Sequence, residues 1–314
     1  MANSSVPPES RFRPRYLLFR VRGLIILVIL IAGCLGWVVN SARRQRATVQ
    51  AIVHSSGGVY YDWQYRNGHF VMGRSARWPK WLDDHVGSDF LDDVTWVKVG
   101  RHGISDAELL QVGYLRQLEE LHVSSLRTDA GLANLEGLGK LRKLFLYGPE
   151  FTDAALAHLK RLTRLRTLGL SNCLVTDAGL VHLNELSSLQ VLGLTNCKVG
   201  DAGLAQLQRR NGLLELGLSG CNVTDAGLAH LEQLSKLQHL LLRRTHVTDA
   251  GMPHLSGLTR LIYLDLAETA VTDAGLEHLK ALKSLSELWL DGSKVTDQGA
   301  RELKRSLPNV TIHR

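Results

Sequence analysis

The sequence lacks the short motifs that mark common catalytic sites. It contains no P-loop, no HExxH zinc pair and no GxSxG nucleophile elbow. Only four cysteines occur in 314 residues, and the three outside the apolar N-terminal stretch form an odd number, which disfavours a closed disulfide framework. These absences favour a binding protein over an enzyme. We expect no catalytic residue, no cofactor and no metal site.

The chain also lacks the basic surface that its net charge of +7 first suggests. Residues 1–46 hold eight of the 37 Lys and Arg residues and one of the 30 acids, Glu9, so 29 basic and 29 acidic residues remain beyond them. With no net charge, that remainder has no electrostatic reason to bind phosphate backbones. We therefore do not expect nucleic acid as a partner. A hydrophobic content of 45% excludes global disorder.

One long apolar run is present, from Gly23 to Val39. These 17 uncharged residues are just long enough to cross a hydrocarbon core of about 30 Å as a helix. Five Arg precede the run and three follow it, which by the positive-inside rule places the N-terminus in the cytoplasm. We predict a basic cytoplasmic tail over residues 1–22 and a signal anchor over residues 23–39. The rest of the chain is then expected on the far side of the cell membrane.

Two alternatives for this run stay open. One is a cleaved secretory signal, although such signals have shorter apolar regions followed by polar chain. The other is lipidation at Cys34, because Ile31-Ala32-Gly33-Cys34 is similar to a bacterial lipoprotein cleavage box. Leu35 and the apolar residues after it continue the hydrophobic run where a mature lipoprotein usually turns polar. All three readings place residues 47 onward outside the hydrocarbon.

An internal repeat dominates the rest of the chain. The string Thr-Asp-Ala-Gly-Leu, or a close variant, begins at eight positions spaced by 24 residues: Thr128, Thr152, Thr176, Gly200, Thr224, Thr248, Thr272 and Thr296. A degenerate copy, Ser105-Asp106-Ala107, stands 23 residues before the first. We call each 24-residue unit a rung.

A second string of apolar residues keeps the same period. Leu165, Leu168 and Leu170 recur every 24 residues, and degenerate copies extend the series from Val94 to Ile312, which gives ten strand signals. In each copy the last two apolar residues alternate at strand spacing, whereas the leucines that follow recur at helical spacing. One rung therefore reads as strand, turn, helix and return.

A single rung of this kind cannot bury its own leucines, so neighbouring rungs must stack into one continuous core. Within the repeat, Thr176 is expected to cap a helix, Asp177 to complement the helix dipole, and Gly179 to let the backbone approach its neighbour. A residue that recurs in every rung is more often scaffold than site. Function is therefore expected where the repeat is broken.

The segment LRTLGLSNCLVTDAGLVHLNEL resembles the cysteine-containing, ribonuclease-inhibitor-like leucine-rich repeat, which also forms the substrate-binding half of F-box proteins. The resemblance covers residues 94–314. It implies an α/β fold, a right-handed leucine-rich-repeat solenoid with a curved parallel sheet inside and helices outside. Together with the Arg-flanked span, the chain is similar to bacterial membrane-anchored leucine-rich-repeat proteins. No F-box-like helical module precedes the repeats, so ubiquitin-adaptor activity is not carried over.

Residues 40–93 form a juxtamembrane segment rich in aromatic residues. Val59–Arg66 and His69–Gly73 flank Asn67-Gly68, which predicts a two-residue hairpin. We interpret the aromatic residues as an N-terminal cap that shields the first rung's core, as solenoids require. A sugar-binding platform, including Trp63, is the functional alternative.

Two further columns of residues follow the repeat. Cys173, Cys197 and Cys221 share one position in three consecutive rungs, and we interpret them as buried free thiols rather than a redox or metal site. Five histidines recur on the expected outer helices, too far apart to share a metal ion: His158, His182, His230, His254 and His278.

The residues between the strand leucines are expected to project from the concave sheet. Central rungs carry Gly169, Gly193 and Gly217, which offer little side-chain chemistry. Aromatic and charged residues of the kind found in binding hot spots flank them: Lys143, Phe145 and Tyr147 on one side, and Arg243, Arg244, Tyr263, Asp265, Glu287, Trp289 and Asp291 on the other.

The sequence thus predicts a membrane-anchored scaffold that binds a protein partner on its concave face. An envelope carbohydrate or polymer binder is one alternative. An adaptor resembling the substrate-binding half of F-box proteins is another.

Overall fold

The computed structural model describes residues 14–54, 57–66, 69–70, 79, 81, 85, 87, 92–99 and 104–314. By internal contacts the chain divides into two units, Met1–Arg44 and Gln45–Arg314. The first contains most of helix α1 (Pro14–His54). The stretch Gly23–His54 is long and apolar enough to cross a membrane, by its length and composition. The helix is longer than the predicted 23–39: it begins at Pro14 and continues without a break to His54.

The last turns of α1 belong to the second unit and pack against the first rung. Val49 and Ile52 are buried in the same hydrophobic core as the repeat leucines. The Gln45 side-chain amide donates to the Asp92 carbonyl (2.6 Å), and the Thr48 hydroxyl to the Gln111 carbonyl (3.4 Å). Part of the expected N-terminal cap is therefore helical.

Two short pieces of extended chain complete this N-terminal cap. Strand β1 (Gly58–Tyr61) pairs antiparallel with the first strand of the repeats, β4 (Val94–Lys98). Strands β2 (Tyr65–Arg66) and β3 (His69–Phe70) pair antiparallel with each other. The predicted turn residues 67–68 lie outside the described residues. The hairpin prediction is thus confirmed for its inner residues. The predicted first strand, Val59–Arg66, is too long. Its first residues belong to β1, which pairs with the open edge of β4 instead.

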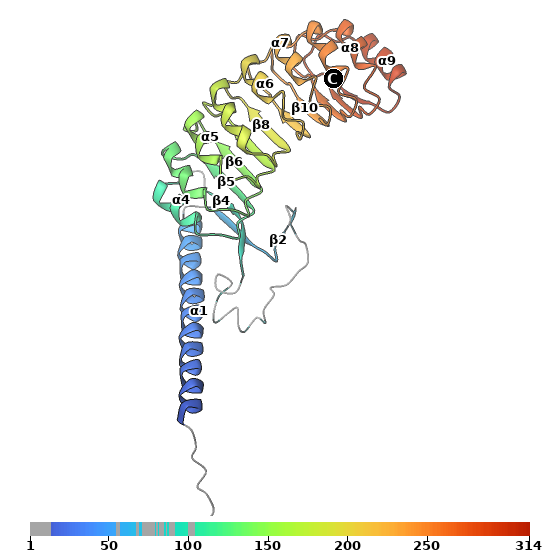
Figure 1. Ribbon diagram of the computed structural model, residues 1–314. Coiled ribbons are helices and arrows are strands. Elements are labelled where there is room, and N and C mark those ends of the chain that lie inside the picture. Colours follow the sequence, from blue (N-terminus) through green and yellow to red (C-terminus); the bar gives the residue numbers. More distant parts are fainter. Residues whose placement is uncertain are drawn as a thin grey trace, which may run out of the picture. The chain divides into compact units, whose positions relative to one another are not determined.

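Ten parallel strands follow one another in chain order, as the ten strand signals predicted. After β4 they are β5 (Glu120–Ser124), β6 (Lys143–Tyr147), β7 (Thr167–Ser171), β8 (Val191–Thr195), β9 (Glu215–Gly217), β10 (His239–Leu241), β11 (Tyr263–Asp265), β12 (Glu287–Trp289) and β13 (Thr311–His313). Equivalent residues of successive rungs pair in register. For example, Leu144 pairs with Leu168, and Leu168 pairs with Leu192. Within the second unit the strands line the inner side of an arc and the helices its outer side (Figure 1).

The outer segments are helical in every rung, but not all are α-helices. The α-helices are α4 (Asp106–Val112), α5 (Asp153–Leu159), α6 (Asp201–Leu207), α7 (Asp225–Leu228), α8 (Asp273–Leu279) and α9 (Asp297–Ser306). The 3-10 segments are η1 (Asp129–Leu135), η2 (Asp177–Glu185), η3 (Ala229–Leu231) and η4 (Asp249–Leu255). Segments of about two turns lie near the lower limit of helix length, so packing of their leucines decides their exact form.

The repeated Thr-Asp pair ties each rung to the next. The hydroxyl of Thr176 accepts a hydrogen bond from the Ala178 N–H, as the N-cap prediction requires. In addition, the Asp153 carboxylate of the preceding rung accepts from the Thr176 N–H and from its hydroxyl, both at 2.7 Å. The same pair of hydrogen bonds joins the other neighbouring rungs from Asp129 to Asp273, except that Gly200 offers only its N–H to Asp177. The aspartate therefore reaches beyond its own helix, a role that the sequence did not reveal.

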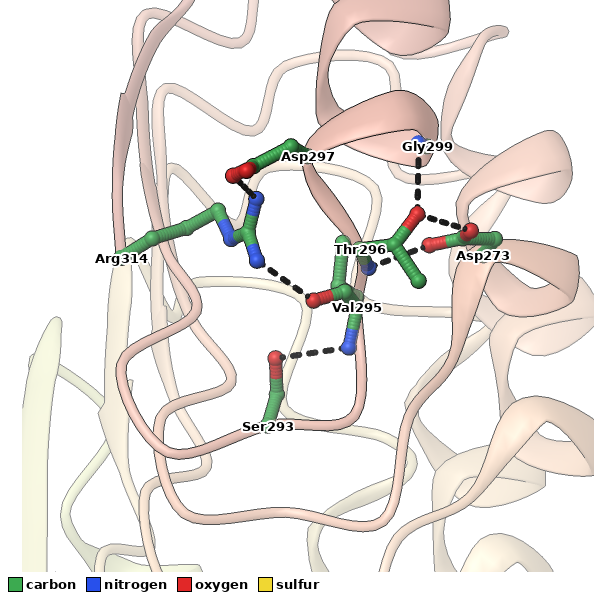
Figure 2. A network of polar contacts seen from close by, with 7 residues as sticks. All are labelled: Asp273, Ser293, Val295, Thr296, Asp297, Gly299 and Arg314. Carbon is green, nitrogen blue, oxygen red and sulfur yellow. Dashed lines mark hydrogen bonds and ion pairs between the residues drawn. The ribbon is translucent and has the colours of Figure 1, made fainter.

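The repeated glycine makes room for this aspartate. A Cβ on Gly251 would lie 2.5 Å from Oδ1 of Asp225. In the one rung that carries alanine there, Ala155, the Asp129 Oδ1 to Thr152 N distance is 3.2 Å, against 2.6–2.8 Å in the other Thr-Asp contacts. Figure 2 shows Asp273 bound to Thr296. In the same view Asp297 contacts the guanidinium of Arg314, which also donates to the Val295 carbonyl (2.8 Å).

Candidate functional site

The concave face is built from side chains that alternate along each strand. In β6, Leu144 and Leu146 are fully buried, whereas Lys143, Phe145 and Tyr147 are half-buried and point the other way. Because the strands pair in register, the residue between the two leucines forms a continuous row across the sheet. The row runs His122, Phe145, Gly169, Gly193, Gly217, Leu241, Asp265, Trp289 and His313.

The middle of this row is a smooth surface, which we call the glycine floor: Gly169, Gly193 and Gly217. A Cβ on Gly193 would meet nothing nearer than the Gly169 Cα, at 3.7 Å. Above Gly169 the space is taken by the ring of Phe145, which leans over it from the neighbouring strand. The floor is therefore narrower than the sequence indicated.

Aromatic rings stack at the N-terminal end of the floor. Phe145 lies on His122, with ring centroids 4.4 Å apart and an interplanar angle of 18°. Tyr147 stands 6.5 Å from Phe145 in a similar orientation. His122 in turn contacts Trp96 (5.3 Å), which joins this stack to the N-terminal cap. The two aromatic site residues predicted here thus belong to one continuous set of rings.

A buried carboxylate, Glu120, organises the polar side of this end. It accepts hydrogen bonds from Trp96 Nε1 (3.0 Å), from the Tyr65 hydroxyl and from His122 Nε2 (2.6 Å), and it pairs with Lys143 Nζ (3.2 Å). Burial opposes its ionisation, but these donors and the lysine outweigh burial and lower the pKa of Glu120 to about 2. Lys143 is thus engaged within the cluster rather than projecting freely. A hollow of about 210 Å³ lies beside it, lined also by Arg142 and Arg166.

A second aromatic group stands at the C-terminal end of the floor. Trp289 stacks on His313 from the last strand, with ring centroids 3.9 Å apart and an angle of 14°. The Glu287 carboxylate accepts a hydrogen bond from His313 Nε2 (2.6 Å). Tyr263 lies 6.5 Å from Trp289. The indole N–H of Trp289 is enclosed, and it has no acceptor in the part of the chain that the structure describes.

The exposure of Asp265 differs from the prediction. It was expected to project from the concave face, but it is only 8% exposed, and Oδ1 accepts from the Ala267 N–H (2.9 Å). Its register neighbours Leu241 and Trp289 stand on either side, so a short side chain between them is occluded. Burial, together with the nearby Asp291, raises the pKa of Asp265 above its usual range.

Arg243 and Arg244 are held by one acid that the sequence analysis did not single out. Glu268 pairs with Arg243 Nε (3.0 Å) and with Arg244 Nε (3.0 Å). Arg244 and Glu268 both adopt a positive φ, 57° and 55°, at a turn position that Gly148, Gly220 and Gly292 occupy in other rungs. Large side chains are disfavoured in this conformation, so these two residues break the repeat's own local rule.

The three solenoid cysteines are buried free thiols, as interpreted. Cys221 Sγ donates to the Leu194 carbonyl (2.8 Å), and burial raises the pKa of its thiol to about 12. In later rungs the hydroxyls of Thr245 and Thr269 donate to Leu242 and Leu266 carbonyls at 2.6 and 2.7 Å. In five consecutive rungs, from Cys173 to Thr269, this position therefore donates to a backbone carbonyl. No three metal-binding side chains converge within the described ranges.

Sequence reasoning missed His122, His313 and Glu120, although they complete the two groups. His122 and His313 stand in the same row as Phe145 and Trp289, so reading that row through its first and last strands would have found them. Glu120 carried no such signal, because its donors come from segments up to 55 residues away.

Some aromatic side chains of the N-terminal cap are buried or hydrogen-bonded, and others are exposed. Tyr65 is 2% exposed, and the Trp63 indole donates to Asp92 Oδ2 (3.1 Å). Phe70 and Trp81 are 55% and 66% exposed. Trp78 and Phe90 lie outside the described residues. The cap is therefore built largely by packing, with two described aromatic rings facing outward.

The register, the alternating burial and the outer helices define a leucine-rich-repeat solenoid. A family profile described as Leucine Rich repeat matches residues 185–207. No curated protein matches the chain at a significant level.

Several solved structures have a similar arrangement, among them three bacterial proteins. Internalin C2 of Listeria monocytogenes is 22% identical with a TM-score of 0.46, over 70% of this chain and 80% of that one. Internalin inlF of the same species is 20% identical with a TM-score of 0.42, over 65% and 69%. A leucine-rich-repeat protein of Leptospira interrogans is 20% identical with a TM-score of 0.45, over 65% and 56%.

Proposed function

We propose that this protein is a membrane-anchored scaffold that binds a protein partner on the concave face of its solenoid. One observation carries the proposal: the residues of the concave row depart from the repeat in two groups, one at each end of the glycine floor. A solenoid needs no aromatic side chain in this row, because the row lies outside the core. Partly exposed aromatic and charged residues around a flat centre are the composition of binding hot spots.

The C-terminal group supports the proposal most strongly. Tyr263 and Trp289 are only half-buried, and the enclosed indole N–H of Trp289 has no acceptor among the described residues. Burial raises the pKa of Tyr263, and the nearby Asp265 and Glu287 raise it further. Arg243 and Arg244 share the single carboxylate of Glu268. Four acids, Asp265, Glu268, Glu287 and Asp291, thus stand against two arginines at this end. A partner segment with a cationic side chain complements this end of the face.

Anchoring rests on helix α1. Its apolar stretch is continuous with the turn that carries Val49 and Ile52 into the core of the first rung. The helix also runs unbroken through Cys34, the alternative lipidation site. We propose a signal anchor over residues 23–39, with residues 1–22 in the cytoplasm and the repeats on the far side of the membrane.

The test compares capture of crosslinked partners by full-length chains in native membranes. The Tyr263→Ala, Trp289→Ala double variant should lower capture at least tenfold, about 1.4 kcal/mol. Its thermal midpoint should change little, since both rings lie outside the core. The control is Leu174→Ala with Val181→Ala, which removes two apolar side chains that are 41% and 46% exposed and lie outside the concave row.

Undiminished capture by the double variant would move the site off the concave face. Phe70 and Trp81, the exposed rings of the N-terminal cap, would then favour the envelope carbohydrate or polymer alternative, and their alanine variants should lose retention on isolated envelope polymer. Equal loss in the control variant would assign the effect to general destabilisation.

A further inference from the structure

A second recess lies away from the concave row, on the loops that lead from the helices back to the strands. It measures about 430 Å³ and is formed by three consecutive rungs. Four of its lining residues are cationic, Arg116, Lys140, Arg161 and Arg164, and none of the others is acidic. We call it the basic hollow. It is not visible in the net charge, because the acidic residues of the solenoid lie elsewhere.

Two of the four cations contact groups beside the basic hollow. Arg116 Nη1 donates to the Gly137 carbonyl (2.7 Å), and a Cβ on Gly137 would clash with this guanidinium. Arg161 Nε pairs with Glu136 Oε2 (3.2 Å). A guanidinium has five N–H donors, so each of these contacts leaves donors to spare. Gly139 adds open space, because a Cβ there would meet nothing within 4 Å.

The repeat itself does not require these charges. Lys and Arg are favoured near helix C-termini by the helix dipole, but that preference applies to every rung equally. In the next rung the residues equivalent to Arg161 and Arg164 are Glu185 and Ser188. The series of cations is interrupted there, although Lys236 and Arg260 occupy the position of Arg164 again in later rungs. The basic hollow differs from those later sites because three successive rungs carry a cation at this position and Arg161 adds a fourth.

We propose that the basic hollow binds a compact phosphate-bearing group. A phosphate offers several acceptor oxygens and up to two negative charges, and the planar fork of arginine matches it with paired hydrogen bonds. Four cations around one recess with no lining carboxylate give such an anion a well-defined place. The recess spans only three rungs, so it fits a single compact group, either a lipid headgroup or a soluble phosphate.

The test titrates the full-length chain, held in phosphatidylcholine nanodiscs, with sodium tripolyphosphate and measures the heat of binding. Arg116→Gln with Arg164→Gln should weaken the affinity at least tenfold. The matched control, Lys236→Gln with Arg260→Gln, also removes two exposed cations, both from the position of Arg164 in later rungs. It should change the affinity less than twofold.

A second variant tests the hollow without removing a cation. Gly139→Glu places a carboxylate in the open space and should abolish binding while the thermal midpoint stays unchanged. A parallel titration with dihexanoyl phosphatidylglycerol, below its micelle concentration, distinguishes the source: tighter binding of this probe identifies a lipid headgroup, and binding of tripolyphosphate alone identifies a soluble phosphate. Equal loss in the control, or no saturable binding of either probe, would overturn the proposal.

Discussion

Glu120 shows how one side chain links the N-terminal cap to the first rungs. Its carboxylate contacts Tyr65 from the cap, Trp96 from β4, His122 beside it and Lys143 from β6. A carboxylate that is only 7% exposed is tolerated because every one of these groups favours its charged form. The cluster therefore fixes the aromatic stack of His122 and Phe145 as well as the cap.

Glu120→Gln should make the unfolding free energy depend less on pH. The pKa of Glu120 falls from about 4.3 in an unfolded chain to about 2 in the fold. Its stabilisation is therefore complete above about pH 5 and is lost as the pH falls toward 2. We expect wild type to exceed the variant by about 1–3 kcal/mol at pH 7, and by less at pH 3.

Urea unfolding followed by tryptophan fluorescence measures this difference. Glu136→Gln, at a partly exposed acid paired with Arg161, serves as the control and should differ little from wild type at either pH. A gap between wild type and Glu120→Gln that is the same at pH 7 and pH 3 would contradict the role assigned to the carboxylate.

At the scale of one helix and its neighbour, the Thr-Asp contact explains why threonine, aspartate and glycine recur together in the repeat. The threonine caps its own helix, the aspartate reaches the next threonine, and the glycine leaves room for that aspartate. Three positions thus perform one joint task across a rung boundary. Opposite Ala155 the N–H contact of Asp129 is longer, at 3.2 Å, whereas the hydroxyl contact is kept at 2.5 Å.

Asp225→Ala should loosen the joint between two central rungs. It removes the acceptor of the Thr248 N–H (2.7 Å) and hydroxyl (2.6 Å), and an N–H left unsatisfied there costs about 1–3 kcal/mol. Hydrogen exchange should accelerate in peptides that cover Thr248. In the control, Asp297→Ala, the lost side chain is 82% exposed and contacts Arg314, so its effect should stay below about 1 kcal/mol. Equal effects would disprove a stabilising ladder.

For the whole molecule, the orientation of the chain in the membrane decides which partners the concave face can meet. A single cysteine introduced at Lys294, an exposed residue of the last rungs, should react with a membrane-impermeant thiol reagent in intact cells. The wild-type chain serves as the control, because Cys173, Cys197 and Cys221 are buried and Cys34 lies in the apolar run. Reaction only after lysis would show that the repeats are cytoplasmic.

Local and periodic signals made most of the fold predictable. The 24-residue period, the ten strands and the threonine N-caps each depend on contacts within a few residues, and these signals recur in rung after rung. The helix that continues to His54 and the antiparallel strand β1 were not foreseen. Both pack against the first rung, whose exposed edge exists only after the strands have stacked.

By itself, the sequence determined the solenoid, its apolar helix and the row of residues that faces the concave side. Only the tertiary structure decided what that row can do. Stacking buries Asp265 between Leu241 and Trp289, brings Lys143 to Tyr65 across 78 residues, and gathers Arg116, Lys140 and Arg164 around one hollow. These contacts join different rungs. They depend on how far each rung is displaced from the last, and a pattern within one rung carries no record of that displacement.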